Sequence, residues 1–270
     1  MDIYNSIALL CIILLGIPHG ALDNTIARMK GWPNTVYYFF IFHFTYIIIS
    51  LLVIIFWLYQ PIASLLIFLL ISGLHFAHSE YNDDELKDKI SFLSHAGLIP
   101  VIIPWAHTDD VFEIFLLLTN DKIHFLIPII NYLFYTWLLV FFLYTVNFLR
   151  GKYHKKSYIQ LIIFIILIFL LPPLVSFSIY FCLVHGPRHM INILRSLSKK
   201  EKYQAIRETV IYSTLTFILI FSAAYYVGDN KNISADLLKI TFIGLAALTV
   251  PHMILVDYMK ISFKKTHRFK

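Results

Sequence analysis

The sequence is poor in charge: 14% of its 270 residues are Asp, Glu, Lys or Arg, whereas 59% are hydrophobic. A soluble domain carries about a quarter charged residues, and no hydrophilic stretch here is long enough to form one. The mean hydropathy is +0.74. Apolar runs of about 20 residues recur along the chain, which is the length that a helix needs to cross a bilayer. We therefore predict one integral-membrane domain over residues 1–270.

The chain is also poor in cysteine, with two residues, Cys11 and Cys182. Both lie inside apolar runs and are expected to be packing residues. We do not expect the first apolar run to be a secretory signal, because Asp2 replaces the basic start and no small-residue cleavage site follows the run. We expect this run to be the first spanning helix. The net charge of +6 lies in short loops, so it predicts membrane topology and no nucleic-acid partner.

Nine apolar runs are candidate spans, and Pro172-Pro173 must end the sixth because proline cannot continue a helix. The runs are Ile3–Ile17, Val36–Tyr59, Pro61–Ala77, Ile90–Ala106, Ile123–Leu149, Tyr158–Leu171, Leu174–Leu194, Ala205–Val227 and Leu237–Met259. The predicted fold is an all-α polytopic membrane protein, a bundle of eight or nine transmembrane helices. The count is eight if the fourth or sixth run is re-entrant.

Lysine and arginine near span ends predict the orientation, because they stay on the cytoplasmic side of a membrane. With nine spans, the basic clusters around Arg28, Arg150, Arg195 and the C-terminal tail all fall on one side. We therefore expect the cytoplasmic membrane, with the N-terminus outside and the C-terminus inside. The acidic segments around Asp109 and Asp236 then lie outside. The largely acidic loop from Glu80 to Lys89 fits this orientation poorly.

Several of the twelve histidines fall in or beside apolar runs, where a polar side chain is costly and therefore a candidate functional group. They are His19, His43, His75, His78, His95, His185, His189 and His252. His185 and His189 are four residues apart, so on a helix they share a face at roughly 5–6 Å between Cβ atoms. His75 and His78 share a face in the same way. We expect His43 and His95 to be packing residues bonded to carbonyl groups. From the other six histidines we predict an intramembrane metal site.

Imidazole ligands suit iron, zinc or copper. An all-histidine set with open positions favours iron, although zinc stays open. Asp23, Glu80 and Asp257 follow His19, His75 and His252 along the chain, and each is a candidate to accept a ring N–H and fix the imidazole. The alternative is a solvated helix end. Arg188 is expected to orient a partner such as Asp23, or to snorkel.

Four motifs in this order resemble the Brp/Blh family of membrane β-carotene 15,15′-dioxygenases. They are Gly16-Ile17-Pro18-His19-Gly20-Ala21-Leu22-Asp23, His75-Phe76, His185-Gly186-Pro187-Arg188-His189 and Pro251-His252-Met253. The resemblance implies a catalytic Fe(II) held by His19, His75, His185 and His189, with His252 a further site residue. It also implies that β-carotene and O₂ give two retinals, which a retinal-binding rhodopsin would use. The segment His75-Phe76-Ala77-His78-Ser79-Glu80 departs from the family pattern and makes His78 an additional candidate.

Three other functions are compatible with membrane-embedded histidines. A di-iron desaturase or hydroxylase usually has His-His pairs, which are missing here. A non-catalytic haem-binding protein would use paired histidines as axial ligands. A transporter would have polar residues with charged partners on broken helices, and Pro187 does interrupt one run. No acidic residue lies in the middle of a predicted span, which argues against a proton-coupled transporter.

Overall fold

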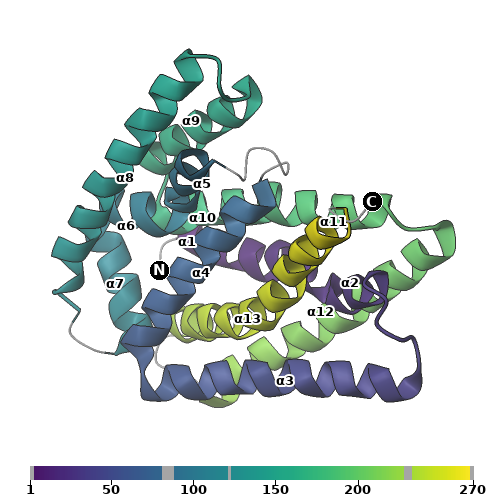
Figure 1. Ribbon diagram of the computed structural model, residues 1–270. Coiled ribbons are helices and arrows are strands. Elements are labelled where there is room, and N and C mark those ends of the chain that lie inside the picture. Colours follow the sequence, from purple (N-terminus) through teal and green to yellow (C-terminus); the bar gives the residue numbers. More distant parts are fainter. Residues whose placement is uncertain (1–2, 81–87, 121–122, 228–232, 268–270) are drawn as a thin grey trace. The chain divides into compact units, whose positions relative to one another are not determined.

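The computed structural model describes residues 3–80, 88–120, 123–227 and 233–267, without the side chains of residues 79–80, 227 and 258–267 (Figure 1). These residues form helices, and no strand occurs among them. This confirms the predicted all-α fold. The first half contains α1 (Ile3–Cys11), η1 (Ile12–Gly16), η2 (Ile17–Leu22), α2 (Asp23–Met29), α3 (Val36–Tyr59), α4 (Pro61–Glu80), α5 (Lys89–Ala96), η4 (Leu98–Ile102), α6 (Ile103–Ala106) and α7 (Thr108–Thr119). The second half contains α8 (Leu126–Leu149), α9 (Lys155–Leu170), α10 (Pro173–Ile179), η5 (Tyr180–His185), α11 (Gly186–Arg195), α12 (Lys199–Val227) and α13 (Ile233–His267).

The number of spanning helices corrects the prediction of eight or nine. In the described part of the chain, six helical stretches are long and apolar enough to cross a membrane, or seven if the pair Lys89–Ala96 and Leu98–Ala106, bent by 45°, is one span. The run predicted sixth forms α9, which is only 16 residues long. The run predicted seventh is divided among α10, η5 and α11, and α11 carries Arg188 and Arg195. A multi-pass membrane protein is nevertheless supported.

Three stretches of wider π-helix, η1, η4 and η5, each end two residues before a proline: Pro18, Pro104 and Pro187. A proline has no N–H to donate, and its ring collides with the carbonyl four residues earlier. Widening the preceding turn relieves that collision. Two of these stretches adjoin predicted iron ligands, because η1 leads to His19 and η5 ends at His185.

The chain divides into two compact units. The first contains Leu9–Ser64 and Gly186–Lys270, and the second contains Asp2–Ala8 and Leu65–His185. His185 and His189 therefore belong to different units. The prediction of one domain stays a prediction.

In the first unit, α3 packs along α13, and α12 packs against both η2 and α13 (Figure 1). A small core of Leu22, Ile26, Ile193, Ala205 and Val256 joins the N-terminal segment to the later helices. Most of the large hydrophobic side chains of α3 are exposed, as expected of a helix that faces lipid. This packing brings η2 and α13, more than 200 residues apart in the chain, to one place.

In the second unit, α5 packs against α8, and glycine permits the close approach. A Cβ on Gly97 would collide with the Trp137 ring, and one on Gly73 would lie 2.5 Å from the Ala96 carbonyl oxygen. Small residues allow membrane helices to approach in this way. The acidic segment that contains Asp109, which no predicted span includes, forms α7 and buries Val111, Phe115, Leu118 and Thr119 at helical spacing.

Candidate functional site

Three imidazoles from three helical segments lie together in the first unit. The ring centres of His19 and His252 are 5.3 Å apart, those of His189 and His252 are 5.2 Å apart, and those of His19 and His189 are 6.0 Å apart. His19 and His252 are buried. The rings meet edge to face, with interplanar angles of 72–88°. Helix packing therefore gathers two of the predicted iron ligands, His19 and His189, around His252.

A buried carboxylate holds one of these imidazoles. Nδ1 of His252 lies 2.7 Å from Oδ1 of Asp23, and both side chains are only 4% exposed. Because an ionised carboxylate can only accept hydrogen bonds, Nδ1 of His252 is the donor. The hydroxyl of Tyr46 contacts Oδ2 of Asp23 at 2.8 Å and the carbonyl oxygen of Leu248 at 3.1 Å. Asp23 thus joins α2, α3 and α13.

This arrangement corrects the expected partner of Asp23. Asp23 was a candidate to accept the ring N–H of His19, one helical turn earlier, with a solvated helix end as the alternative. Instead, Nδ1 of His19 contacts the carbonyl oxygen of Gly16. The segment η2 has 3₁₀ geometry, with about three residues per turn. Residues four apart are then rotated by roughly a third of a turn from each other, so His19 and Asp23 do not share a face as they would on an α-helix.

The other two predicted ligands, His75 and His185, pair in the second unit. Both are buried, and their ring centres are 5.2 Å apart. Phe76 packs edge to face on His185 at 4.8 Å and on Tyr180 at 5.2 Å. The pair therefore sits in aromatic surroundings.

The three other histidine candidates each contact a carbonyl oxygen of their own helix. His95, expected to be a packing residue, contacts the Ser91 carbonyl oxygen at 3.0 Å and packs on Tyr144. His43 likewise contacts the Phe39 carbonyl at 2.8 Å, but it also contacts the Tyr212 hydroxyl at 2.9 Å. His78, the additional candidate, contacts the Leu74 carbonyl oxygen at 2.9 Å and packs on Phe92.

Three further residues were predicted to support the ligands. The side chain of Glu80 lies outside the described residues. Asp257 is half-buried on α13, but the carboxylate bonded to Nδ1 of His252 belongs to Asp23. Arg188, which was expected to orient Asp23 or to snorkel, is half-buried on α11. The hydrogen bonds described above to the Asp23 carboxylate come from His252 and Tyr46. The roles of Arg188 and Asp257 stay predictions.

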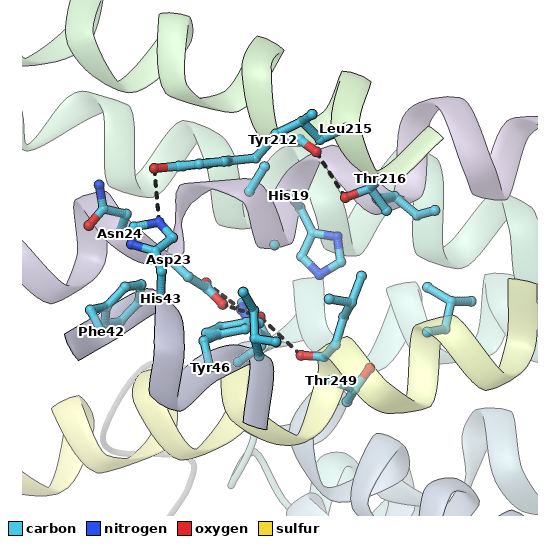
Figure 2. Close-up of a pocket in the computed structure, with 17 residues that line it drawn as sticks. His19, Asp23, Asn24, Phe42, His43, Tyr46, Tyr212, Leu215, Thr216 and Thr249 are labelled. Carbon is cyan, nitrogen blue, oxygen red and sulfur yellow. Dashed lines mark hydrogen bonds and ion pairs between the residues drawn. The ribbon is translucent and has the colours of Figure 1, made fainter. Parts of the chain in front are cut away.

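A cavity of about 300 Å³ lies in the first unit beside the His19 ring (Figure 2). Its walls come from η2, α2, α3, α12 and α13, and most of its surface is apolar. His19, Asp23, Tyr46 and His252 line it. Figure 2 shows the His19 ring pointing toward the space between α12 and α13. The predicted ligand and its neighbours thus face a space that can take a small apolar group.

The donor chemistry of the histidine groups fits iron, since iron binds imidazole well. With metal–nitrogen bonds of about 2.1 Å, two imidazoles on one ion have ring centres roughly 4.5–6.5 Å apart. The ring distances of 5.2–6.0 Å lie within this span. As the described side chains stand, however, no group of three or more His, Cys, Asp or Glu is arranged to hold a metal ion. The four-histidine iron site stays a prediction.

Sequence reasoning missed Tyr46 and Tyr212, which line the cavity and bond to Asp23 and His43. The chain has 17 tyrosines, and an aromatic residue on an apolar helix is ordinarily packing or interface material. Nothing in the local pattern distinguishes these two. Only the packing of α3 against α13 and α12 reveals them.

Comparison with known proteins adds a family match. The profile of a family described as beta-carotene 15,15'-dioxygenase matches residues 10–260. A beta-carotene 15,15'-dioxygenase of uncultured marine bacterium 66A03 is 33% identical over 255 residues, which cover 93% of this chain and 92% of that relative. No solved structure matches the chain. The family match includes every histidine of the two groups described above.

Proposed function

Because the chain belongs to the beta-carotene 15,15'-dioxygenase family, we propose that it cleaves β-carotene with O₂ at the central 15,15′ double bond to give two retinals. The observation that supports this most strongly is the match over 93% of the chain to a relative of that name. The substrate is a hydrocarbon that dissolves in the bilayer. A multi-pass membrane fold with buried histidines suits a reaction carried out there.

The proposed cofactor is a non-haem Fe(II) held by His19, His75, His185 and His189. Iron would supply the activation of O₂, the chemistry that protein side chains lack. All four residues are imidazoles, which are neutral ligands when bound, and three of them are buried. Their burial keeps water away from the reacting atoms.

The residues around these histidines orient them. The Gly16 carbonyl oxygen contacts Nδ1 of His19, which leaves Nε2 as the ring nitrogen for a metal. Bonds of this kind fix the tautomer of a ligand and the direction of its ring. Asp23, itself bonded to Tyr46, does the same for His252. We propose that His252 and Asp23 form one wall of the reaction site and keep the neighbouring rings in place.

The same proposal includes the surroundings of the reaction. β-Carotene would enter from the lipid bilayer, and retinal would leave into it for use by a rhodopsin-type partner. We place the chain in the cytoplasmic membrane with the N-terminus outside. If the bent pair is one span, the chain has seven crossings. Seven crossings place the two termini on opposite sides of the membrane, whereas six would place them on the same side.

The test is expression in a bacterium that accumulates β-carotene, followed by chromatography of the polyenes. We expect loss of colour and the appearance of retinal as the C20 product. Long-chain apocarotenals would show cleavage at another bond, and hydroxylated or desaturated C40 products would favour the di-iron alternative. A Soret band in the purified protein would instead indicate the haem-binding alternative.

A further inference from the structure

We propose that Glu208 of α12 is a positioning residue: it holds α2, the helix that starts at Asp23 just after the segment with His19, and so determines which double bond of the polyene is cleaved. This inference rests on the proposed function and adds a residue that neither the sequence motifs nor the histidine groups include. All the residues that carry it belong to the first unit.

The Glu208 carboxylate accepts four hydrogen bonds. Its Oε1 lies 3.1 Å from Nη1 of Arg28 and 2.9 Å from Nε2 of Gln204. Its Oε2 lies 2.9 Å from Nη2 of Arg28 and 3.1 Å from Nδ2 of Asn24. A carboxylate offers about four lone-pair sites, and here each oxygen accepts two donors. The Arg28 and Glu208 side chains are only 18% and 12% exposed, so the pair is largely enclosed by protein.

These bonds join one face of α2 to one face of α12 (Figure 1). Asn24 and Arg28 are four residues apart, so both project from the same side of α2. Gln204 and Glu208 share a side of α12 in the same way. Arg28 belongs to a basic cluster that predicted the membrane orientation, but its charge is matched by a carboxylate 180 positions away. A topology signal alone needs no such partner.

The helix α2 depends on partners for its position. It is seven residues long, and Leu22 before it makes no side-chain cap. A helix this short is not stable by itself. Leu22 and Ile26 pack in the apolar core of the first unit. Apolar packing has no preferred direction, whereas a paired arginine and carboxylate have a defined geometry. The core therefore keeps α2 against its neighbours, and the Glu208 bonds fix its register along α12.

The register of α2 matters to the site because Asn24 directly follows Asp23. The Asp23 carboxylate holds His252, whose ring centre is 5.3 Å from that of His19. A shift of α2 along α12 would move Asp23 and the adjoining η2 with it. A misplacement of about 1 Å changes a reaction rate about a hundredfold, and neighbouring double bonds of a polyene are only two carbon–carbon bonds apart. Losing the register should therefore allow cleavage beside the central bond.

The decisive variant is Arg28→Met/Glu208→Met, which removes the directional bonds and leaves neither charge of the pair behind. Replacing a buried ion pair by apolar residues of similar volume is often neutral for stability, so this variant separates positioning from folding. The control Arg207→Met/Glu113→Met makes the same exchanges at exposed positions. Thermal unfolding in detergent checks that both proteins fold. If the decisive variant does not fold, Glu208→Gln replaces it, with Glu113→Gln as its control.

The first measurement is hydrogen exchange of the purified, metal-free protein in detergent. We expect the backbone N–H groups of α2 to exchange at least about tenfold faster in Arg28→Met/Glu208→Met than in the wild type, since a hydrogen bond to a charged group contributes that much to an equilibrium. Exchange in α8, which belongs to the second unit, should stay the same. Equal rates in α2, or an equal acceleration in α8, would overturn the inference.

The second measurement is the product pattern in a bacterium that accumulates β-carotene. A protein that is merely less stable makes less retinal but no new product, whereas a displaced α2 also yields apocarotenals longer and shorter than retinal. We expect the ratio of retinal to these products to fall by about tenfold or more in Arg28→Met/Glu208→Met and to keep its wild-type value in the control. If that variant forms no product, Glu208→Gln is compared instead. Retinal as the sole product, at any yield, would overturn the inference.

The two measurements also separate this inference from the proposed function. If the wild type forms no retinal, the function fails, while hydrogen exchange of the metal-free protein still shows whether Glu208 holds α2. If the wild type forms retinal and the variant has the same product pattern, the function stands and Glu208 has no role in choosing the bond.

Discussion

Nδ1 of His252 is 2.7 Å from Oδ1 of Asp23, although the two residues are 229 positions apart in the chain. The contact fastens α13 to the start of α2, directly after the segment that carries His19. Tyr46 adds a third helix to the same carboxylate. The orientation of His252 therefore depends on all three helices.

We expect Asp23→Asn to destabilise the protein and abolish most cleavage. Losing a buried hydrogen bond to a charged group costs about 1.5–3 kcal/mol, and an asparagine amide can turn His252 to the opposite tautomer. The measurements are the thermal unfolding midpoint in detergent and retinal formation. Asp109→Asn, an exposed residue of α7, is the control. If Asp23→Asn matched that control in both measurements, the contact would have no functional role.

The purified protein should contain about one iron per chain. Alanine at His19, His75, His185 or His189 is expected to lower the affinity for iron by at least about tenfold, a loss that even indirect partners of metal sites produce. His95→Gln should keep the metal, since His95 is bonded within its own helix. Metal analysis and activity after chelation and return of Fe²⁺ are the measurements. Full iron content in any one alanine variant removes that residue from the ligand set.

Gly73→Ala should destabilise the second unit. Its Cβ would lie 2.5 Å from the Ala96 carbonyl oxygen and 2.7 Å from Cγ of Pro100, and overpacking of this kind costs about 1–3 kcal/mol. The displaced helix carries His75 two residues later, so retinal formation should fall as well. Gly244→Ala, with open space around its Cβ, is the matched control. Equal unfolding midpoints for the two variants would contradict the close packing.

The ion pair between Asp88 and Lys152 should make the free energy of unfolding depend on pH. Partial burial by itself would raise the pKa of Asp88, but hydrogen bonds from Lys152 and from the backbone N–H of Ile90 outweigh it and lower the pKa. The Asp88 hydrogen bond also raises the pKa of Lys152. A lowered carboxyl pKa means that the stabilisation is present above the unfolded-state pKa, about 3.9, and is lost as the pH falls through the folded value.

Asp88→Asn separates this charge effect from helix capping. Asp88 caps α5 through Ile90, and asparagine caps a helix equally well. We expect the wild type to unfold at a higher temperature than the variant near neutral pH and the difference to vanish in acid, as measured by unfolding midpoints across pH. Because both side chains are partly solvated, the effect should be small and weaken with salt. A difference that persists in acid would contradict the charge effect.

Some of the fold could be predicted because hydropathy acts locally. The span Val36–Tyr59 has the predicted bounds, since an uninterrupted apolar run lies between polar residues and Pro61. Where prolines interrupt the runs, the prediction was less accurate. The stretch from Leu174 to Leu194 reads as one apolar helix, but it is divided among α10, η5 and the polar α11.

The histidines show the same division between local and long-range information. Spacing and resemblance identified His19, His75, His185 and His189 as candidates, because a polar ring in an apolar helix is costly wherever that helix packs. Their neighbours could not be identified in this way. Helical periodicity paired Asp23 with His19, and the 3₁₀ geometry of η2 rotates that pair apart.

The sequence by itself determined that this chain is helical, enters the membrane and has buried imidazoles, since these properties follow from composition and from the cost of polar groups in lipid. Only the tertiary structure decided that Asp23 holds His252, that Tyr46 completes the contact, and that His43 and Tyr212 line a common cavity. Those relationships join residues up to 229 positions apart. They depend on how helices pack, which no local pattern of residues encodes.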